Sequence, residues 1–195
     1  MVDRPSREDP ATKQRIQDYL EKIVPGIVGF ERVALGPYES LEFRQRVQGA
    51  KHPWRFHPSS MSDGTLSALG VLVAVHQAAT QHRATFVGIE EPEAALHPAA
   101  AGALVDALRS ASRQTQVALT SHSPELLSGI DVDNDTLLVV QSEQGTSSIA
   151  PLDPANREAI KDSLYTAGEL LSVQRSPSFD KLCRELEVRC QRVDG

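Results

Sequence analysis

The sequence has few of the features that mark secreted, disulfide-bonded or membrane proteins. It contains two cysteines and 5% aromatic residues, and no apolar run approaches the ~18 residues that a membrane span needs. The opening MVDRPSREDP is charged and contains prolines, so it lacks the apolar core of a signal peptide. We therefore expect a cytoplasmic protein without a membrane segment. Cys183 and Cys190 lie two turns apart on a predicted helix and are expected to stay reduced.

The chain also has no excess of positive charge. Lys and Arg total 20 against 26 Asp and Glu, which gives a formal net charge of −6 at pH 7. Nucleic-acid-binding domains usually carry a basic surface, so DNA binding is not predicted for this chain, although a larger complex that contains it is compatible with DNA. Trp54 and Phe56 in HPWRFHP could stack on bases, but we interpret both as core anchors of a strand.

The overall composition is that of a globular protein. With 195 residues, of which 40% are hydrophobic and 24% charged, the chain suits one domain with a core of ordinary size. We assign residues 1–195 to a single domain with three parts. These are a helix and hairpin region (12–60), a core (61–150) and a helical tail (151–195).

The hydrophobic pattern changes along the chain. Apolar residues at three- and four-residue spacing predict a helix over 11–24, and alternation around a GPYE turn predicts an antiparallel hairpin within 27–56. After residue 61, short apolar runs alternate with helical segments, which is typical of a parallel sheet covered by helices. The predicted strands of that sheet are 85–90, 115–120 and 136–141, the predicted helices are 66–79, 98–111, 124–130 and two more between 155 and 190, and TSSIAPL (146–152) is a candidate edge strand.

Polar side chains gather where these strands end. Glu90 and Glu91 close the strand FVGIEE, with Glu93 two positions later, and Ser121 and His122 close the next strand. Ligands of parallel α/β sheets bind at the carboxyl ends of the strands. Successive side chains of a strand point in opposite directions, so one of two adjacent carboxylates can support a metal ion while the other faces the substrate. Upstream, MSDGT opens a predicted helix, whose free N–H groups favour a phosphate. The combination indicates nucleotide hydrolysis.

Together these motifs resemble the ABC-type ATPase heads of the RecF, SMC and OLD-like group within the AAA family. MSDGT (61–65) is similar to the ABC signature and FVGIEE (86–91) to Walker B. AALHP (94–98) is similar to the D-loop and SHS (121–123) to the segment with the switch histidine. The order and spacing agree with the family, and the resemblance extends over roughly residues 12–175.

The resemblance implies roles for individual residues. Glu91 would orient or deprotonate the attacking water, Glu90 would support Mg²⁺ through its water shell, and His122 would contact the γ-phosphate of ATP. The signature of one head closes over nucleotide held by another, so catalysis requires a dimer. The resemblance assigns Ser62, Asp63, Gly64 and Thr65 to the signature, acting in trans, and Ala95 and His97 to the D-loop.

One motif of the family is missing from this sequence. The Walker A loop, GxxxxGK[ST], needs a lysine directly after a glycine, because its backbone N–H groups cradle the phosphates while the lysine neutralises them. None of the five lysines follows a glycine. The expected fold class is therefore α/β, a P-loop NTPase-like parallel sheet flanked by helices that lacks the Walker A strand and carries an N-terminal helix and β-hairpin. In the family that strand lies between the strand ending at the histidine and the following one, so here the strands at 115–120 and 136–141 are expected either to leave a gap or to pair directly.

Three functions are compatible with these residues. The leading hypothesis is an incomplete ATPase head that uses ATP and Mg²⁺ once a homodimeric or heterodimeric partner, or an N-terminal half, supplies Walker A. A second is a non-catalytic dimerisation module that donates its signature motif in trans. A third, more distant, is a metal-dependent nuclease, which would need more carboxylates on strands than the sequence after residue 140 provides.

The acidic run DVDND is a separate candidate for a metal site. Asp131, Asp133 and Asp135 alternate as in a calcium loop, but the glycine and the distal glutamate of such a loop are missing. We therefore interpret the run as a turn that leads into a strand.

Overall fold

The computed structural model describes residues 9–81, 85–143 and 145–174, and Cys183 and Cys190 lie outside them. The contacts divide the chain into two compact units, the first ending at Ser121 and the second beginning at His122. This division falls inside the predicted core of residues 61–150, and the single domain stays a prediction. In the part of the chain that is described, each helix is too short or too polar to cross a bilayer.

The first unit begins with helix α1 (Pro10–Ile23). The carboxylate of Asp9 accepts hydrogen bonds from the backbone N–H groups of Ala11 and Thr12, at 3.3 and 3.1 Å, and so satisfies free donors at the helix start. The apolar face of α1, which includes Leu20, is buried, as the residue spacing predicts.

A three-stranded antiparallel sheet follows, in the order β1 (Ile27–Leu35), β2 (Tyr38–Gln45) and β3 (Trp54–Phe56). The predicted hairpin is confirmed, since Leu35 pairs with Tyr38 across the turn. Phe43 of β2 is fully buried. The interpretation of Trp54 as a core anchor is wrong, because this side chain is 57% exposed on the short edge strand.

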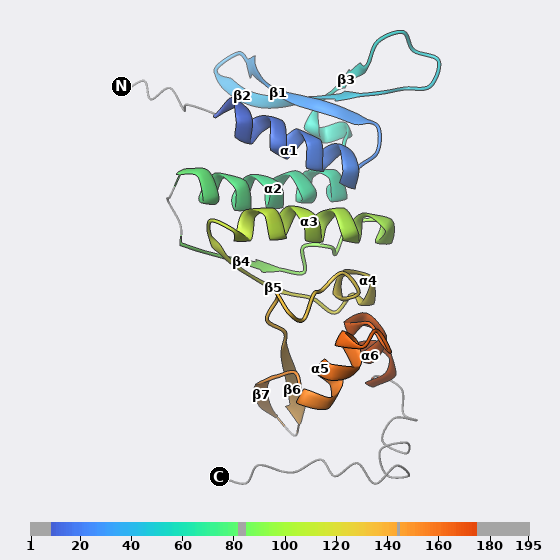
Figure 1. The fold of residues 1–195 in the computed structure, drawn as a ribbon. Coiled ribbons are helices and arrows are strands. Elements are labelled where there is room, and N and C mark those ends of the chain that lie inside the picture. The colour runs from blue at the N-terminus through green and yellow to red at the C-terminus, as the bar shows by residue number, and fades with distance from the viewer. Residues whose placement is uncertain (1–8, 82–84, 144, 175–195) are drawn as a thin grey trace. The chain divides into compact units, whose positions relative to one another are not determined.

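Three helices pack against one another beside this sheet (Figure 1). After the short 3₁₀ turn η1 (Pro58–Ser60), α2 runs over Asp63–Gln81, and α3 covers Ala101–Ser112 after the 3₁₀ turn η2 (Pro98–Ala100). Tyr19 of α1 joins all three helices. Its ring stacks on His76 of α2 with centroids 5.5 Å apart, and its hydroxyl donates to the carbonyl of Asp106 on α3 at 3.4 Å.

Strands β4 (Phe86–Glu90) and β5 (Gln116–Thr120) form a parallel pair, with η2 and α3 between them in sequence. The register sets Phe86 opposite Gln116 and Glu90 opposite Thr120, so the two carboxyl ends lie side by side. The predicted parallel arrangement is thus confirmed for these two strands.

The second unit contains α4 (Pro124–Leu127), β6 (Leu138–Glu143), β7 (Thr146–Pro151), α5 (Pro154–Lys161) and α6 (Ala167–Gln174). Among the described residues, β6 pairs only with β7, in an antiparallel hairpin. The predicted parallel sheet therefore does not extend through hydrogen bonds to its third strand. A two-residue hairpin connection brings β7 to β6 at low entropic cost, whereas a parallel partner needs a long crossover.

Two local features organise this unit. Helix α6 lies so close to α4 that a Cβ on Gly168 would stand 1.9 Å from the carbonyl oxygen of Pro124. The DVDND run forms the expected turn, in which the Asp131 carboxylate accepts hydrogen bonds from the N–H of Asp133 at 3.0 Å and the amide of Asn134 at 2.6 Å.

Candidate functional site at the ends of the parallel strands

The two adjacent glutamates differ in backbone conformation. Glu90 is the exposed last residue of β4, whereas Glu91 has a left-handed φ of 41°. Its N–H donates to the carbonyl of Thr120 at 2.9 Å, and its carbonyl accepts from the N–H of Ala94 at the same distance. A left-handed residue other than glycine costs about 1–2 kcal/mol. Such strain persists where the surrounding structure fixes it, and it occurs most often at functional sites.

A third carboxylate connects the two strand ends. The hydroxyl of Ser121 donates to Oε1 of Glu93 in a short hydrogen bond, while Oε2 of Glu93 is buried and has no hydrogen-bond partner among the described residues. Leaving a buried acceptor unsatisfied costs about 1–3 kcal/mol. Sequence reasoning counted Glu93 among the carboxylates but gave it no role. The contact could have been predicted from the serine at the end of the next parallel strand, because the carboxyl ends of neighbouring parallel strands lie side by side.

The signature segment begins helix α2. Ser62 caps the helix, because its Oγ accepts a hydrogen bond from the N–H of Thr65 at 3.2 Å and lies 2.9 Å from the Thr65 hydroxyl. Thr65 is 2% exposed. Ser62 and Asp63 are exposed, and Asp63 stands in the first turn, where the helix dipole favours a negative charge.

The segments predicted to be the signature and the D-loop touch within the chain. A Cβ on Gly64 would stand 2.1 Å from the carbonyl oxygen of Ala95, far inside van der Waals contact. Only glycine permits this approach of the two backbones. Nearby, the exposed side chain of His97 accepts a hydrogen bond from the N–H of Ala99 at 3.2 Å through Nδ1 and caps η2. Gly64, assigned from the sequence to a nucleotide on a partner, thus has a packing role in its own chain.

The switch histidine lies at the boundary of the two units. His122 is the exposed first residue of the second unit and follows Ser121 directly. Beyond it, Ser123 caps α4, with its Oγ accepting from the N–H of Leu126 at 3.3 Å. The contact of His122 with the γ-phosphate stays a prediction.

The carboxylates at the strand ends suit Mg²⁺ only if water and substrate phosphates complete its coordination. The described residues hold no group of three or more His, Cys, Asp or Glu side chains that could cage a metal ion. Mg²⁺ commonly keeps several waters and binds one or two carboxylates together with substrate phosphates. The exposed carboxylate of Glu90 at a strand end suits that mode. A phosphate cradle of the Walker A kind has no counterpart in this sequence.

Comparison with known proteins identifies related sequences and folds. The model of the family described as "AAA domain, putative AbiEii toxin, Type IV TA system" matches residues 12–128. No curated protein matches the chain.

Several solved structures share the fold. One comes from work on ATP-driven dimerisation and DNA-stimulated activation of SMC ATPases, with a TM-score of 0.56 and 16% identity over 79% of this chain and 91% of that one. The Smc head domain of Pyrococcus furiosus, bound to the C-terminal domain of ScpA, has a TM-score of 0.57 and 16% identity. The Smc head domain of Pyrococcus yayanosii has a TM-score of 0.56 and 18% identity. The match covers 79% of this chain in both cases but only 37% and 29% of those chains, which include coiled coils. The fold is therefore that of an SMC-type ATPase head, a P-loop NTPase fold.

Proposed function

Because this chain belongs to the AAA domain family, we propose that it is part of an ABC-type ATPase head that hydrolyses ATP once another segment supplies Walker A. The strained backbone of Glu91 carries the proposal. Glu91 follows the carboxyl end of a parallel strand. Glu90 precedes it in the sequence, and a hydrogen bond between Ser121 and Glu93 connects the two strand ends.

The acidic strand end supplies the proton chemistry. Glu91 accepts a proton from the attacking water or orients it, and its fixed backbone reduces the reorganisation that this step requires. Glu90 would support Mg²⁺, which would supply neutralisation of the phosphate charge when bound. Glu93 fixes Ser121, the residue before His122, and His122 contacts the γ-phosphate.

The signature works on a second head. Ser62 and Asp63 are exposed and available to a partner's nucleotide, whereas Gly64 and Thr65 are buried, and Gly64 packs against the D-loop. One structural neighbour comes from work on the ATP-driven dimerisation of SMC ATPases. We extend that arrangement to this chain, as a homodimer or as a heterodimer with an intact head.

The edge of β5 is suited to receive the strand that leads to Walker A. The N–H of Gln116 donates to Thr85 at 3.0 Å and Thr120 accepts from Glu91, so alternate residues of β5 bond β4. The backbone groups of Val117 and Leu119 then face the other edge. No further strand of the described residues pairs there. Parallel strands are normally covered on both faces, yet Phe86 of β4 is 54% exposed, which supports a missing layer.

The decisive experiment uses the chain with and without a co-expressed strand and GxxxxGK[ST] loop. The chain alone should release no phosphate from ATP, and the completed complex should do so with Mg²⁺. In that complex, Glu91→Gln should lower turnover about 100-fold or more while nucleotide binding stays nearly intact, because the amide cannot accept the proton. The mutant should accumulate as an ATP-bound dimer in size-exclusion chromatography.

A variant in the signature motif distinguishes dimerisation of the heads from the hydrolysis step. Ser62→Arg should prevent the ATP-bound dimer by steric block. Ser62→Ala, the matched control, loses the same helix cap but adds no bulk, so it should still dimerise. If Glu91→Gln and Ser62→Arg both hydrolyse ATP like the parent complex, the acidic strand end is not catalytic, and the non-catalytic dimerisation module becomes the better account. Metal-dependent cleavage of DNA that Glu91→Gln abolishes would favour a nuclease instead.

A further inference from the structure

We propose that strand β3 and the loop before it bind single-stranded nucleic acid. In this β3 edge site, defined as residues 46–57, a base stacks on Trp54 and the backbone phosphates contact Lys51 and Arg55. The inference does not depend on ATP hydrolysis, because no residue of the site belongs to the parallel strand ends.

The charge of this segment is opposite to that of the whole chain. Residues 43–62 contain no Asp or Glu, although the chain has a formal net charge of −6. The same stretch carries four cations: Arg44, Arg46, Lys51 and Arg55. A local basic surface of this kind attracts phosphates at physiological salt, since exposed charges farther apart than about 8 Å are largely screened there.

The fold presents an aromatic ring beside these cations. Trp54 pairs with Gln45 of β2, and among the described residues β3 has no partner on its other edge. The indole ring is supported by Phe56, with ring centroids 6.4 Å apart. Residues 47–54 line an open hollow of about 550 Å³ next to the ring. An exposed indole above an open hollow is the arrangement on which unpaired bases stack.

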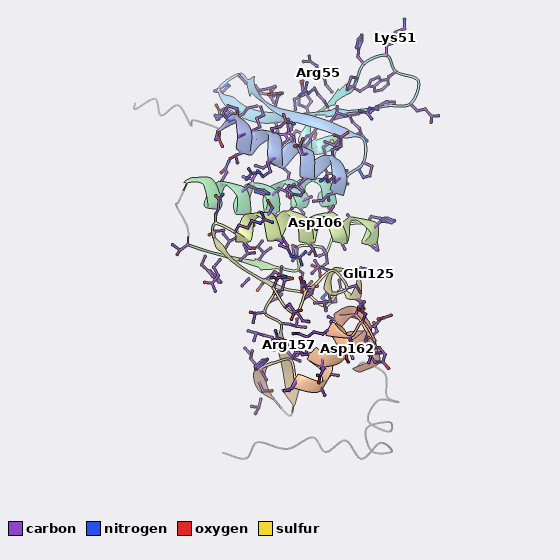
Figure 2. All side chains as sticks on the ribbon, in the orientation of Figure 1. Lys51, Arg55, Asp106, Glu125, Arg157 and Asp162 are labelled. Atoms are coloured by element: carbon purple, nitrogen blue, oxygen red, sulfur yellow. The ribbon has the colours of Figure 1, made fainter. Side chains whose placement is uncertain are left out.

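The cations of the site are available to a ligand. Arg55 pairs with Glu42 at 3.2 Å and Arg46 with Glu21 at 3.9 Å, but these arginine side chains are 73% and 74% exposed. The Arg46–Glu21 pair is exposed on both sides and contributes little, so a phosphate can replace that carboxylate. Glu42 is only 19% exposed, so Arg55 keeps this pair and offers its remaining N–H donors to a phosphate. Lys51 has no acidic partner in the described part of the chain. Figure 2 shows Lys51 and Arg55 projecting outward, on the side of the sheet away from α1.

The aromatic ring selects nucleic acid over an acidic peptide. Carboxylates need only the cations, whereas bases also gain from stacking on the indole, and each stacked base contributes enough to be measured when the ring is removed. A single strand is favoured over a duplex because its bases are free to leave the stack.

The chain's single tryptophan makes the test direct. Adding oligothymidylate to the full chain at low salt should quench Trp54 fluorescence, and anisotropy of a labelled oligonucleotide gives the affinity. Trp54→Ala should weaken binding at least about fivefold, and Trp54→Phe should restore part of it. Lys51→Glu should weaken binding and lower the slope of log affinity against log salt by about one. Arg113→Glu makes the same charge change at the exposed end of α3 and should leave affinity within about twofold of the parent.

Three results would overturn the inference. The first is no quenching and no binding at low salt. The second is Trp54→Ala binding like the parent, which would leave charge alone as the cause. The third is polyglutamate binding and quenching as strongly as oligothymidylate, which would assign the surface to acidic protein. None of these results bears on ATP hydrolysis, so failure here is distinguishable from failure of the proposed ATPase function.

Discussion

The buried imidazole of His76 should make the protein less stable below neutral pH. His76 is 1% exposed, and its ring stacks on Tyr19 at an interplanar angle of 12°. Burial lowers the pKa of His76 from its ordinary 6.5 to about 4, and the charge of Arg15 acts in the same direction. The imidazole is therefore neutral in the folded chain at physiological pH, in the contact that joins α1 to α2.

The size and sign of the effect follow from that shift. Between pH 6.5 and about 4 the unfolded chain binds a proton on His76 that the folded chain does not. Each pKa unit corresponds to roughly 1.4 kcal/mol. The free energy of unfolding should thus be constant above pH 6.5 with respect to this group, fall through the window, and level off below pH 4 after a loss of about 3 kcal/mol.

Urea denaturation of the parent and two variants at several pH values between about 7.5 and 4.5 measures this loss. His76→Phe keeps a ring against Tyr19 but cannot titrate, so its stability should fall less. His57→Gln removes an exposed histidine and should follow the parent. Carboxylates with lowered pKa values, such as that of Glu31 in its hydrogen bond with Lys13, lose their contribution as pH falls in all three proteins and cancel in the differences. Equal pH slopes for the parent and His76→Phe would refute the reasoning.

Three further substitutions test the backbone contacts. Gly64→Ala sets a methyl group against the D-loop carbonyl and should lower the free energy of unfolding by about 1–3 kcal/mol, while Gly70→Ala, in open space on the same helix, should raise it by about 0.5–1 kcal/mol in the same urea assay. Gly168→Ala should loosen α6 from Pro124 and expose the second unit to limited proteolysis, and unchanged cleavage rates would contradict the contact. Glu91→Gly should raise the free energy of unfolding by about 1 kcal/mol, because glycine adopts the left-handed conformation without strain, and a loss of stability would argue against that strain.

The elements that the sequence predicts well have local signals. Helix α1 buries residues at three- and four-residue spacing, and the turn between Leu35 and Tyr38 closes a hairpin between alternating runs. Both patterns depend on neighbours within a few positions. The parallel pairing of β4 with β5 was predicted for a related reason, since a strand, a helix and a strand in close succession fold back only as a parallel unit.

The errors involve contacts that local pattern does not specify. The strand at residues 138–143 was predicted, and the absence of direct pairing with β5 among the described residues agrees with one of the two expected arrangements. Its hairpin partner was not specified, because an apolar run has the same composition in a hairpin as in a parallel sheet. Trp54 was assigned to the core on the interpretation that basic residues do not interleave with the aromatic ones, although Arg55 lies between Trp54 and Phe56. Burial depends instead on what covers an edge strand. Net charge likewise carries no information on how charge is distributed, because it averages an acid-free stretch of twenty residues (43–62) with an acidic remainder.

At the candidate site the sequence predicted which segments contribute, but it did not specify the contacts between them. The hydrogen bond from Ser121 to Glu93 joins residues 28 positions apart, and Gly64 meets Ala95 across a similar interval. Within the signature motif, the buried Gly64 packs against the same chain, whereas Ser62 is exposed and can contact a second head. A variant of Gly64 changes packing inside the chain, so a loss of activity there says nothing about a partner's nucleotide. Ser62 is exposed and its cap is replaceable, so it is the position at which action on a second head is measured separately from folding.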